Sequence, residues 1–92
     1  MCWRARSRNI ELVPRFLLCH RHNPDECAAA VVAWRGFASP LRGQPVTSSC
    51  AYGGHHAWWD VEAPDREAAL TLLPRFVAQR TEVVRVAMLE IP

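Results

Sequence analysis

The stretch FLLCHRHNPDE, residues 16–26, joins a short apolar run directly to a helix start. Residues 16–20 predict a buried strand, because the run is apolar, short and bounded by prolines. Asn23 can cap a helix, Pro24 suits its first position, and Glu26 stands at capping-box spacing with its charge near the helix N-terminus. We therefore expect a strand followed at once by a helix, which Gly36 ends.

A second pair of strands follows this unit. Residues 46–52 and 55–63 flank the Gly-Gly pair at 53–54, which is a signal for a two-residue hairpin turn. Such a turn would pair Cys50 with Ala57 and place alternate side chains on opposite faces of the sheet. We expect Ala57 to belong to the helix-facing side.

The C-terminal part predicts another helix and a last strand. Asp65 can cap this helix, and Pro74 should kink it, because proline has no N–H to donate to the carbonyl of residue 70. Residues 82–91 read as the last strand. The order strand, helix, hairpin, helix, strand predicts an α+β, ferredoxin-like βαββαβ sandwich. It has a four-stranded antiparallel sheet with two helices on one face, and its first strand lies between the third and the fourth.

The charge distribution divides the chain into two parts. Residues 1–12 lack periodicity and form the expected flexible arm, and residues 13–92 form the domain. The net charge of +2 originates in the arm, where Arg4, Arg6 and Arg8 outnumber a single acid. Because the domain itself is balanced, no basic face predicts binding to nucleic acid.

Composition excludes several classes of protein. The chain contains no lysine, which excludes Schiff-base chemistry and a Walker-type phosphate loop. No apolar run approaches the length of a membrane span, and no secretory leader is recognisable. We therefore expect a cytoplasmic protein without a membrane partner.

Four cysteines are present, and their spacing gives no CxxC motif. Cys2 lies in the arm, so Cys19, Cys27 and Cys50 cannot all pair within the domain, and reduced thiols are expected. Cys27 stands in the first helical turn, where backbone dipoles lower the pKa of a thiol. Cys50 reads as a small buried apolar residue.

The four histidines converge at one end of the predicted sheet. His20 and His22 share one face of the first strand, and the neighbouring third strand begins at His55 and His56. Three imidazoles, from His20, His22 and His56, suit Ni, Zn or Cu, with His55 and Cys27 as further candidate ligands. The alternative is that these are ordinary polar residues at a strand end and a turn.

A set of short segments spread over residues 16–92 carries a resemblance to known proteins. The segments are His20-Arg21-His22, Asp25-Glu26-Cys27, Ser39-Pro40-Leu41-Arg42, Ser49-Cys50, Gly53-Gly54-His55, Trp58-Trp59 and residues 85–92. In these segments the chain resembles a family of small, mostly uncharacterised actinobacterial proteins. The resemblance implies the ferredoxin-like fold and brings no established activity. More distantly, the chain is similar to small nickel-binding ferredoxin-like proteins and to dimeric α/β-barrel proteins.

Three classes of function remain open. The converging histidines favour a domain that binds a divalent transition metal. The fold and the tryptophans also fit a small-molecule site in a dimeric α/β barrel, and a plain interaction module needs no chemistry at all. No catalytic residue is assigned. One face of the sheet would lack a helical cover, which predicts a homodimer through that face.

Overall fold

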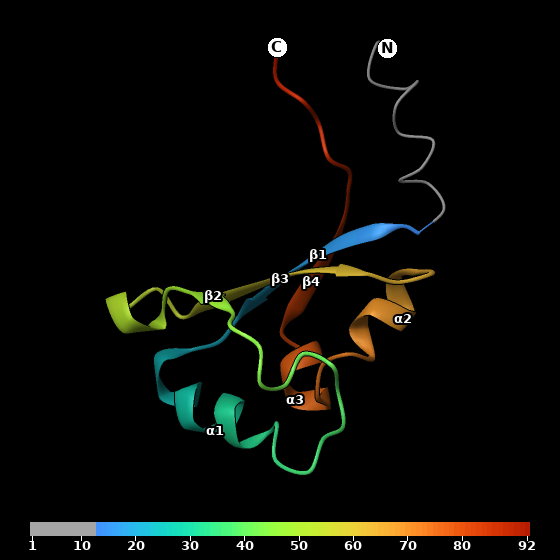
Figure 1. The fold of residues 1–92 in the computed structure, drawn as a ribbon. Helices are drawn as coiled ribbons and strands as arrows, with labels where there is room; N and C mark the ends of the chain where they lie inside the picture. The colour runs from blue at the N-terminus through green and yellow to red at the C-terminus, as the bar shows by residue number, and fades with distance from the viewer. Residues whose placement is uncertain (1–12) are drawn as a thin grey trace.

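The computed structural model describes residues 13–92, so the predicted arm and Cys2 lie outside the described part of the chain. The elements alternate between short strands and short helices (Figure 1). In chain order they are β1 (Arg15–Arg21), the 3-10 helix η3 (Pro24–Glu26), α1 (Cys27–Val32), β2 (Thr47–Ser48), the 3-10 helix η4 (Cys50–Tyr52), β3 (His56–Glu62), α2 (Arg66–Leu70), α3 (Arg75–Ala78) and β4 (Thr81–Val86).

The four strands form one antiparallel sheet in the order β2-β3-β1-β4. Helices α1, α2 and α3 all lie on the same side of this sheet (Figure 1). The predicted α+β class is confirmed, and so is the position of the first strand between the third and the fourth. This arrangement is compatible with a ferredoxin-like fold.

Both helical segments are shorter than the sequence predicts. The first is an α-helix only as far as Val32. From there to Gly36 the chain forms turns, with hydrogen bonds between residues three apart, such as Trp34 N–H to Val31 O. The second is divided into α2 and α3, because Pro74 adopts an extended backbone and begins α3. The expected kink is therefore a complete break.

The last strand also ends earlier than residues 82–91 predict. β4 stops at Val86, which pairs with Arg15, the first residue of β1. Beyond this pair β1 offers no further residue, so the chain leaves the sheet (Figure 1). None of the helices in residues 13–92 is long and apolar enough to cross a membrane.

The core lies between the sheet and its helices. Alternate residues of β1 point inward, so that Phe16, Leu18 and His20 are buried, as the period of two predicts. Ala57 and Val61 of β3 face the same side and are also buried. The apolar cluster consists of Phe16, Leu18, Val61, Ala63, Ala69, Leu73, Val77 and Val83.

The predicted register of the hairpin is wrong by two residues. The observed partners are Ser48 with Ala57, whereas a two-residue turn would pair Cys50 with Ala57. Residues 50–52 instead form η4, and the turn closes through the N–H of Gly54, which donates to Ser49 O at 2.9 Å. A side chain at Gly54 would collide with the Ser49 side chain, so glycine is required there. Because the shift is even, the paired residues Thr47 and Ser48 keep their predicted faces of the sheet.

Candidate metal centre

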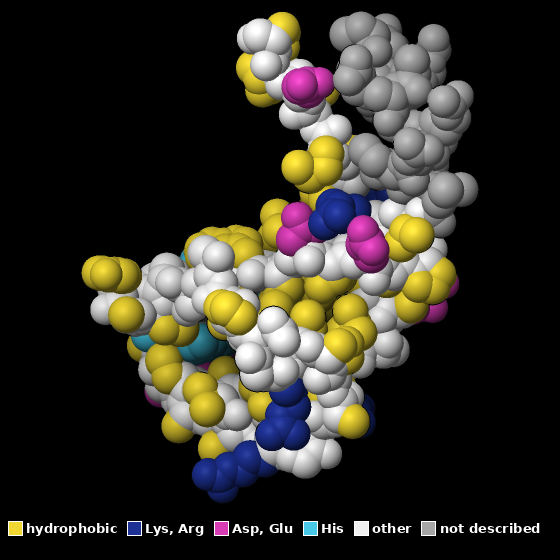
Figure 2. All heavy atoms as spheres, in the orientation of Figure 1, with side chains coloured by type: hydrophobic (Ala, Val, Ile, Leu, Met, Phe, Trp, Pro, Cys, Tyr) yellow, Lys and Arg dark blue, Asp and Glu magenta, His cyan; other side chains and the backbone are white. Residues whose placement is uncertain are grey.

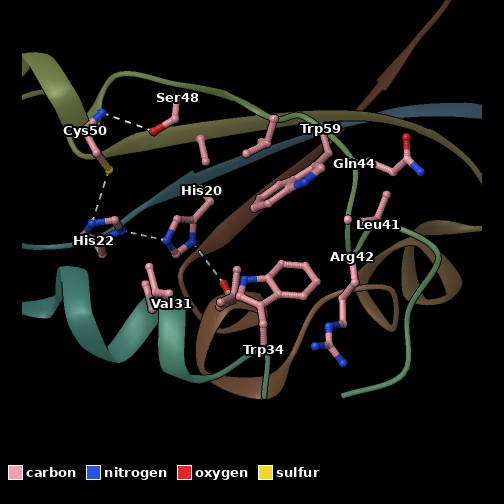
Figure 3. A pocket seen from close by; sticks show the side chains of 15 residues that line it. His20, His22, Val31, Trp34, Leu41, Arg42, Gln44, Ser48, Cys50 and Trp59 are labelled. Atoms are coloured by element: carbon pink, nitrogen blue, oxygen red, sulfur yellow. Dashed lines mark hydrogen bonds between the residues drawn. The ribbon is translucent and has the colours of Figure 1, made fainter. Parts of the chain in front are cut away.

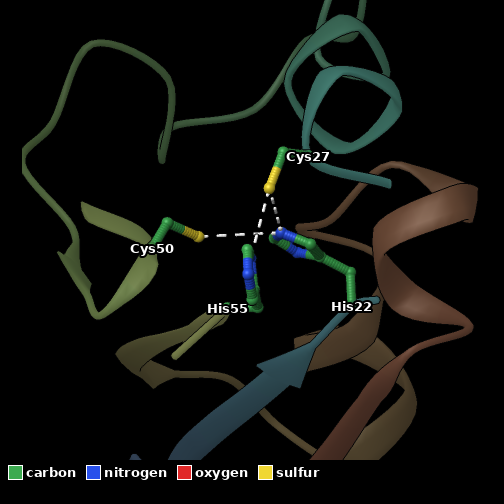
Figure 4. Close-up of side chains that lie close together, drawn as sticks. All are labelled: His22, Cys27, Cys50 and His55. Atoms are coloured by element: carbon green, nitrogen blue, oxygen red, sulfur yellow. Dashed lines mark hydrogen bonds between the residues drawn. The ribbon is translucent and has the colours of Figure 1, made fainter. Parts of the chain in front are cut away.

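Four side chains meet at one end of the sheet (Figure 4). Two come from the connection between β1 and α1, and two come from the turn before β3. His22 follows β1, Cys27 begins α1, Cys50 begins η4, and His55 precedes β3. One ligand atom from each lies within 4.8 Å of all the others. The cluster is the meeting point of two loops that are far apart in the sequence.

The interatomic distances suit a tetrahedral metal ion. His22 Nε2 lies 3.3 Å from Cys27 Sγ and 3.6 Å from Cys50 Sγ, and Cys27 Sγ lies 3.2 Å from His55 Nδ1. Zinc bonds of about 2.0–2.1 Å to nitrogen and 2.3 Å to sulfur give tetrahedral N···S edges of about 3.5 Å. The three N···S distances therefore already stand close to the spacing of a Cys₂His₂ site, and all four ligand atoms lie within 4.8 Å of one another.

Local hydrogen bonds hold Cys27 at this position. The N–H of Asn23 donates to Glu26 Oε1 at 2.9 Å, which closes the helix start predicted from the sequence. Arg80 donates to both oxygens of Glu26, at 3.3 and 3.1 Å. Because Arg80 lies between α3 and β4, this pair joins the start of α1 to the connection between α3 and β4.

Cys50 and His55 are positioned by the turn before β3. The N–H of Cys50 donates to Ser48 Oγ at 3.1 Å, and the N–H of His22 donates to His55 O at 3.1 Å. His55 has a φ of 57°, a left-handed conformation that side-chain-bearing residues seldom adopt. Such backbone strain is concentrated at functional sites. It accompanies the placement of this imidazole beside Cys27.

A chain of hydrogen bonds behind the cluster fixes the tautomer of His22. His20 Nδ1 faces Val77 O at 3.3 Å, and a carbonyl oxygen only accepts, so Nδ1 carries the proton. Burial lowers the pKa of His20, whose ring is therefore neutral at pH 7 and accepts at Nε2. His22 Nδ1, 3.0 Å away, must then donate to it. This leaves the lone pair of His22 Nε2 directed at the two cysteines.

The thiol of Cys27 behaves differently from the sequence expectation. Partial burial, and then the neighbouring Cys50, raise the pKa of Cys27 rather than lowering it. The sulfur points into the cluster, where burial outweighs any helix-dipole effect of the short α1. A bound cation would reverse this, since metal coordination favours the thiolate.

The structure brings together three of the five predicted ligands: His22, Cys27 and His55. His20 touches His22, but both of its ring nitrogens are used by protein groups. His56 points to the other face of the sheet, where its ring stacks on Trp58 with centroids 5.4 Å apart. Its Nδ1 donates to the carbonyl of the turn residue Gly54 at 2.7 Å.

Sequence reasoning missed Cys50 as a ligand. Two signals were available: Cys50 and His55 share a face of the predicted hairpin, and the ligands form pairs of matched spacing. His22 and Cys27 enclose four residues, and so do Cys50 and His55. Closely spaced ligand pairs separated by a longer stretch are typical of structural zinc sites.

Comparison with family models, curated proteins and solved structures gives no match to this chain. The functional argument therefore depends on the geometry of the cluster.

Proposed function

We propose that this protein is a small ferredoxin-like domain that binds one transition-metal ion through His22, Cys27, Cys50 and His55. The observation that carries the proposal is the convergence of these four ligand atoms within 4.8 Å. Among Ni, Zn and Cu, two thiolates and two imidazoles in a tetrahedral arrangement suit Zn²⁺ best.

The donor set supports a structural role for the ion. Four protein ligands complete a tetrahedron and leave no open position for a reacting water, which is the arrangement of structural zinc. The ion would join the end of β1, the start of α1 and the turn before β3. The turn before β3 and the strand that leads into it hold little regular structure of their own, since β2 has two residues and η4 has three. Metal binding would therefore contribute directly to the folding free energy of this end.

Metal analysis of untagged protein tests the proposal. We expect one equivalent of zinc by elemental analysis, and a thiolate-to-cobalt charge-transfer absorption after exchange with Co²⁺. The Cys27→Ser variant should lose both signals. Cys19→Ser is the matched control, because Cys19 lies on β1 with its pKa raised by burial and by Glu82, away from the cluster. Stoichiometric, tight binding by Cys27→Ser would overturn the proposal.

We also propose that the helix-free face of the sheet mediates a homodimer. Supporting this, Leu17 pairs with Val84 on this face, and Trp58 pairs with Cys19, the next residue of β1 on the same face. Val84 is exposed, and Leu17 and Trp58 are only partly buried. Light scattering at micromolar concentration should give the mass of two chains, and Trp58→Glu should give one. Tyr52→Glu, at an exposed turn position, is the control. A monomeric wild-type protein would contradict this second proposal.

A further inference from the structure

A cavity of about 350 Å³ lies directly beside the metal centre, between the sheet, α1 and the loop that precedes β2 (Figure 3). His22 and Cys50, two of the four candidate ligands, line one end of it (Figure 3). On the molecular surface, histidine atoms are visible inside a hollow bordered by hydrophobic side chains (Figure 2). The cavity and the metal cluster therefore share a wall.

The walls of the cavity are mainly apolar and aromatic. Trp34 and Trp59 lie next to each other with ring centroids 5.8 Å apart and planes tilted by 46°. Ala30, Leu41 and Val77 complete the surface around them. Two adjoining indoles offer faces and edges against which another aromatic ring can pack.

The mouth of the cavity leaves apolar groups in water. Val31 is 72% exposed and Val46 is 41% exposed, although both line the cavity. The lining includes one formally charged residue, Arg42, whose guanidinium donates to Phe37 O at 3.3 Å at an exposed position. A ligand that covers the valines would gain from apolar burial and would meet little charge.

We propose that this cavity binds a small, uncharged, planar aromatic molecule that carries one hydroxyl or N–H donor. The aromatic body would pack against Trp34 and Trp59 on one side and against the valines at the mouth on the other. The donor would point to the end lined by His22 and Cys50, where Cys50, held as a thiolate by the metal, would supply a hydrogen-bond acceptor. This last feature rests on the proposed metal function, whereas the apolar cavity does not.

The shared wall also couples the two binding events. A metal ion would fix His22 and Cys50 in one arrangement and so preform the end of the cavity that they line. Coupling of this kind is reciprocal, so an aromatic ligand must strengthen metal binding by the same factor as the metal strengthens ligand binding.

Titration with 2-naphthol, followed by calorimetry, tests the cavity. We expect saturable binding with one site per chain, about fivefold or more tighter in the zinc-loaded than in the zinc-free protein. The anion naphthalene-2-sulfonate, which has the same ring system, should bind more weakly. No binding of 2-naphthol at millimolar concentration, or preference for the sulfonate, would overturn the proposal.

Two alanines of α1 provide a matched pair of variants. Ala30 is buried and lines the cavity, whereas Ala29 in the same helix is exposed. Ala30→Leu places a branched side chain inside the cavity and should weaken 2-naphthol binding by about tenfold or more. Ala29→Leu should bind as the wild type does. Equal affinities for the two variants would show that 2-naphthol binds elsewhere and would overturn the assignment.

The two proposals fail in distinguishable ways. A protein that binds 2-naphthol and loses this binding in Ala30→Leu, yet takes up no zinc or cobalt, would retain the cavity and refute the metal function. A protein that binds one equivalent of cobalt but no 2-naphthol would retain the metal function and refute the ligand assigned to the cavity. Affinity for 2-naphthol that is equal with and without zinc would refute the coupling.

Discussion

The inward-facing side chains of β1, and of His22 directly after it, are buried by different means at the two ends of the strand. At the Arg15 end, Phe16 and Leu18 are 3% and 0% exposed and lie inside the apolar cluster. At the other end, His20 and His22 are 2% and 7% exposed, although both are polar. The same alternation places all four on one face, yet only the first pair gains free energy simply by leaving water.

The difference shows where each half obtains its stability. Apolar burial needs no partner of defined geometry, so the Arg15 end should keep its structure over a wide range of conditions. A buried imidazole requires a hydrogen bond at each nitrogen, or a metal ion, to offset its lost hydration. Here the Val77 carbonyl, the paired rings and the two thiols supply those partners. The histidine end should therefore respond to metal and pH.

The largest expected effect belongs to the apolar half. Leu18→Ala removes a completely buried side chain and should lower the free energy of unfolding by about 2–5 kcal/mol. Urea unfolding of zinc-free protein measures it. Cys19→Ala, the next residue on the partly exposed face, should cost much less. Similar losses for both variants would show that the apolar half does not depend on inward packing.

Metal removal should act on the histidine half. With free zinc at 100 times the dissociation constant, the ion should stabilise the protein by about 2.7 kcal/mol. Chelation, or the His22→Gln substitution, should abolish this gain, and the gain should also shrink in acid, where protons compete with the metal ion for its ligands. Thermal melts with and without zinc measure it. If zinc did not change the melting temperature of the wild-type protein, the histidine end would not depend on a metal ion.

Behind the ligands, His20 should act as a positioning residue. His20→Leu leaves His22 Nδ1 without its acceptor and should weaken zinc binding by about 10- to 100-fold. His20→Gln can still accept from His22 and donate to Val77 O, and should retain most of the affinity. Imidazole ¹⁵N spectra report the tautomer of His22 directly. Equal affinity of His20→Leu and wild type would refute this role.

The smallest effect concerns the ion pair that fastens α1. Hydrogen bonds from Arg80 lower the pKa of Glu26, so the pair adds stability above the ordinary glutamate pKa. That contribution disappears as the pH falls through the lowered value. Glu26→Gln should therefore be less stable than wild type at pH 7, and the gap should close in acid. Acid titrations of zinc-free protein measure it, and a gap that persists at low pH would point to packing instead.

The sequence predicts the parts of this fold that follow from periodicity and end signals. The inward residues of β1, the capped start at Asn23 and the meeting of His22 with His55 all follow from alternation and strand order. The placement of Cys50 does not, because it depends on η4, a turn of three residues. Its formation is favoured by the Ser48 and Ser49 hydroxyls, which propensity rules do not weigh.

The other errors have a similar origin. His56 is predicted as a ligand beside His20 and His22 because it is close to them in the strand register. Alternation along β3 instead places its ring on the opposite face of the sheet. At Pro74 the sequence predicts a kink, because a missing N–H is compatible with either a bend or a break, and the extended backbone of Pro74 makes it a break. Neighbours along the chain were predicted well, and side chains that meet through irregular turns were not.

The separation of the two ligand pairs along the chain has a consequence for the segment between them. An ion held by Cys27 and Cys50 would close residues 28–49 into a ring, a stretch that includes the exposed loop before β2. Closing a ring restricts the conformations open to the chain between its ends, and this entropic cost grows only slowly with the length of the loop. The ion would thus act as a reversible cross-link of the folded protein. The mobility of this loop would then depend on the concentration of free metal around the protein.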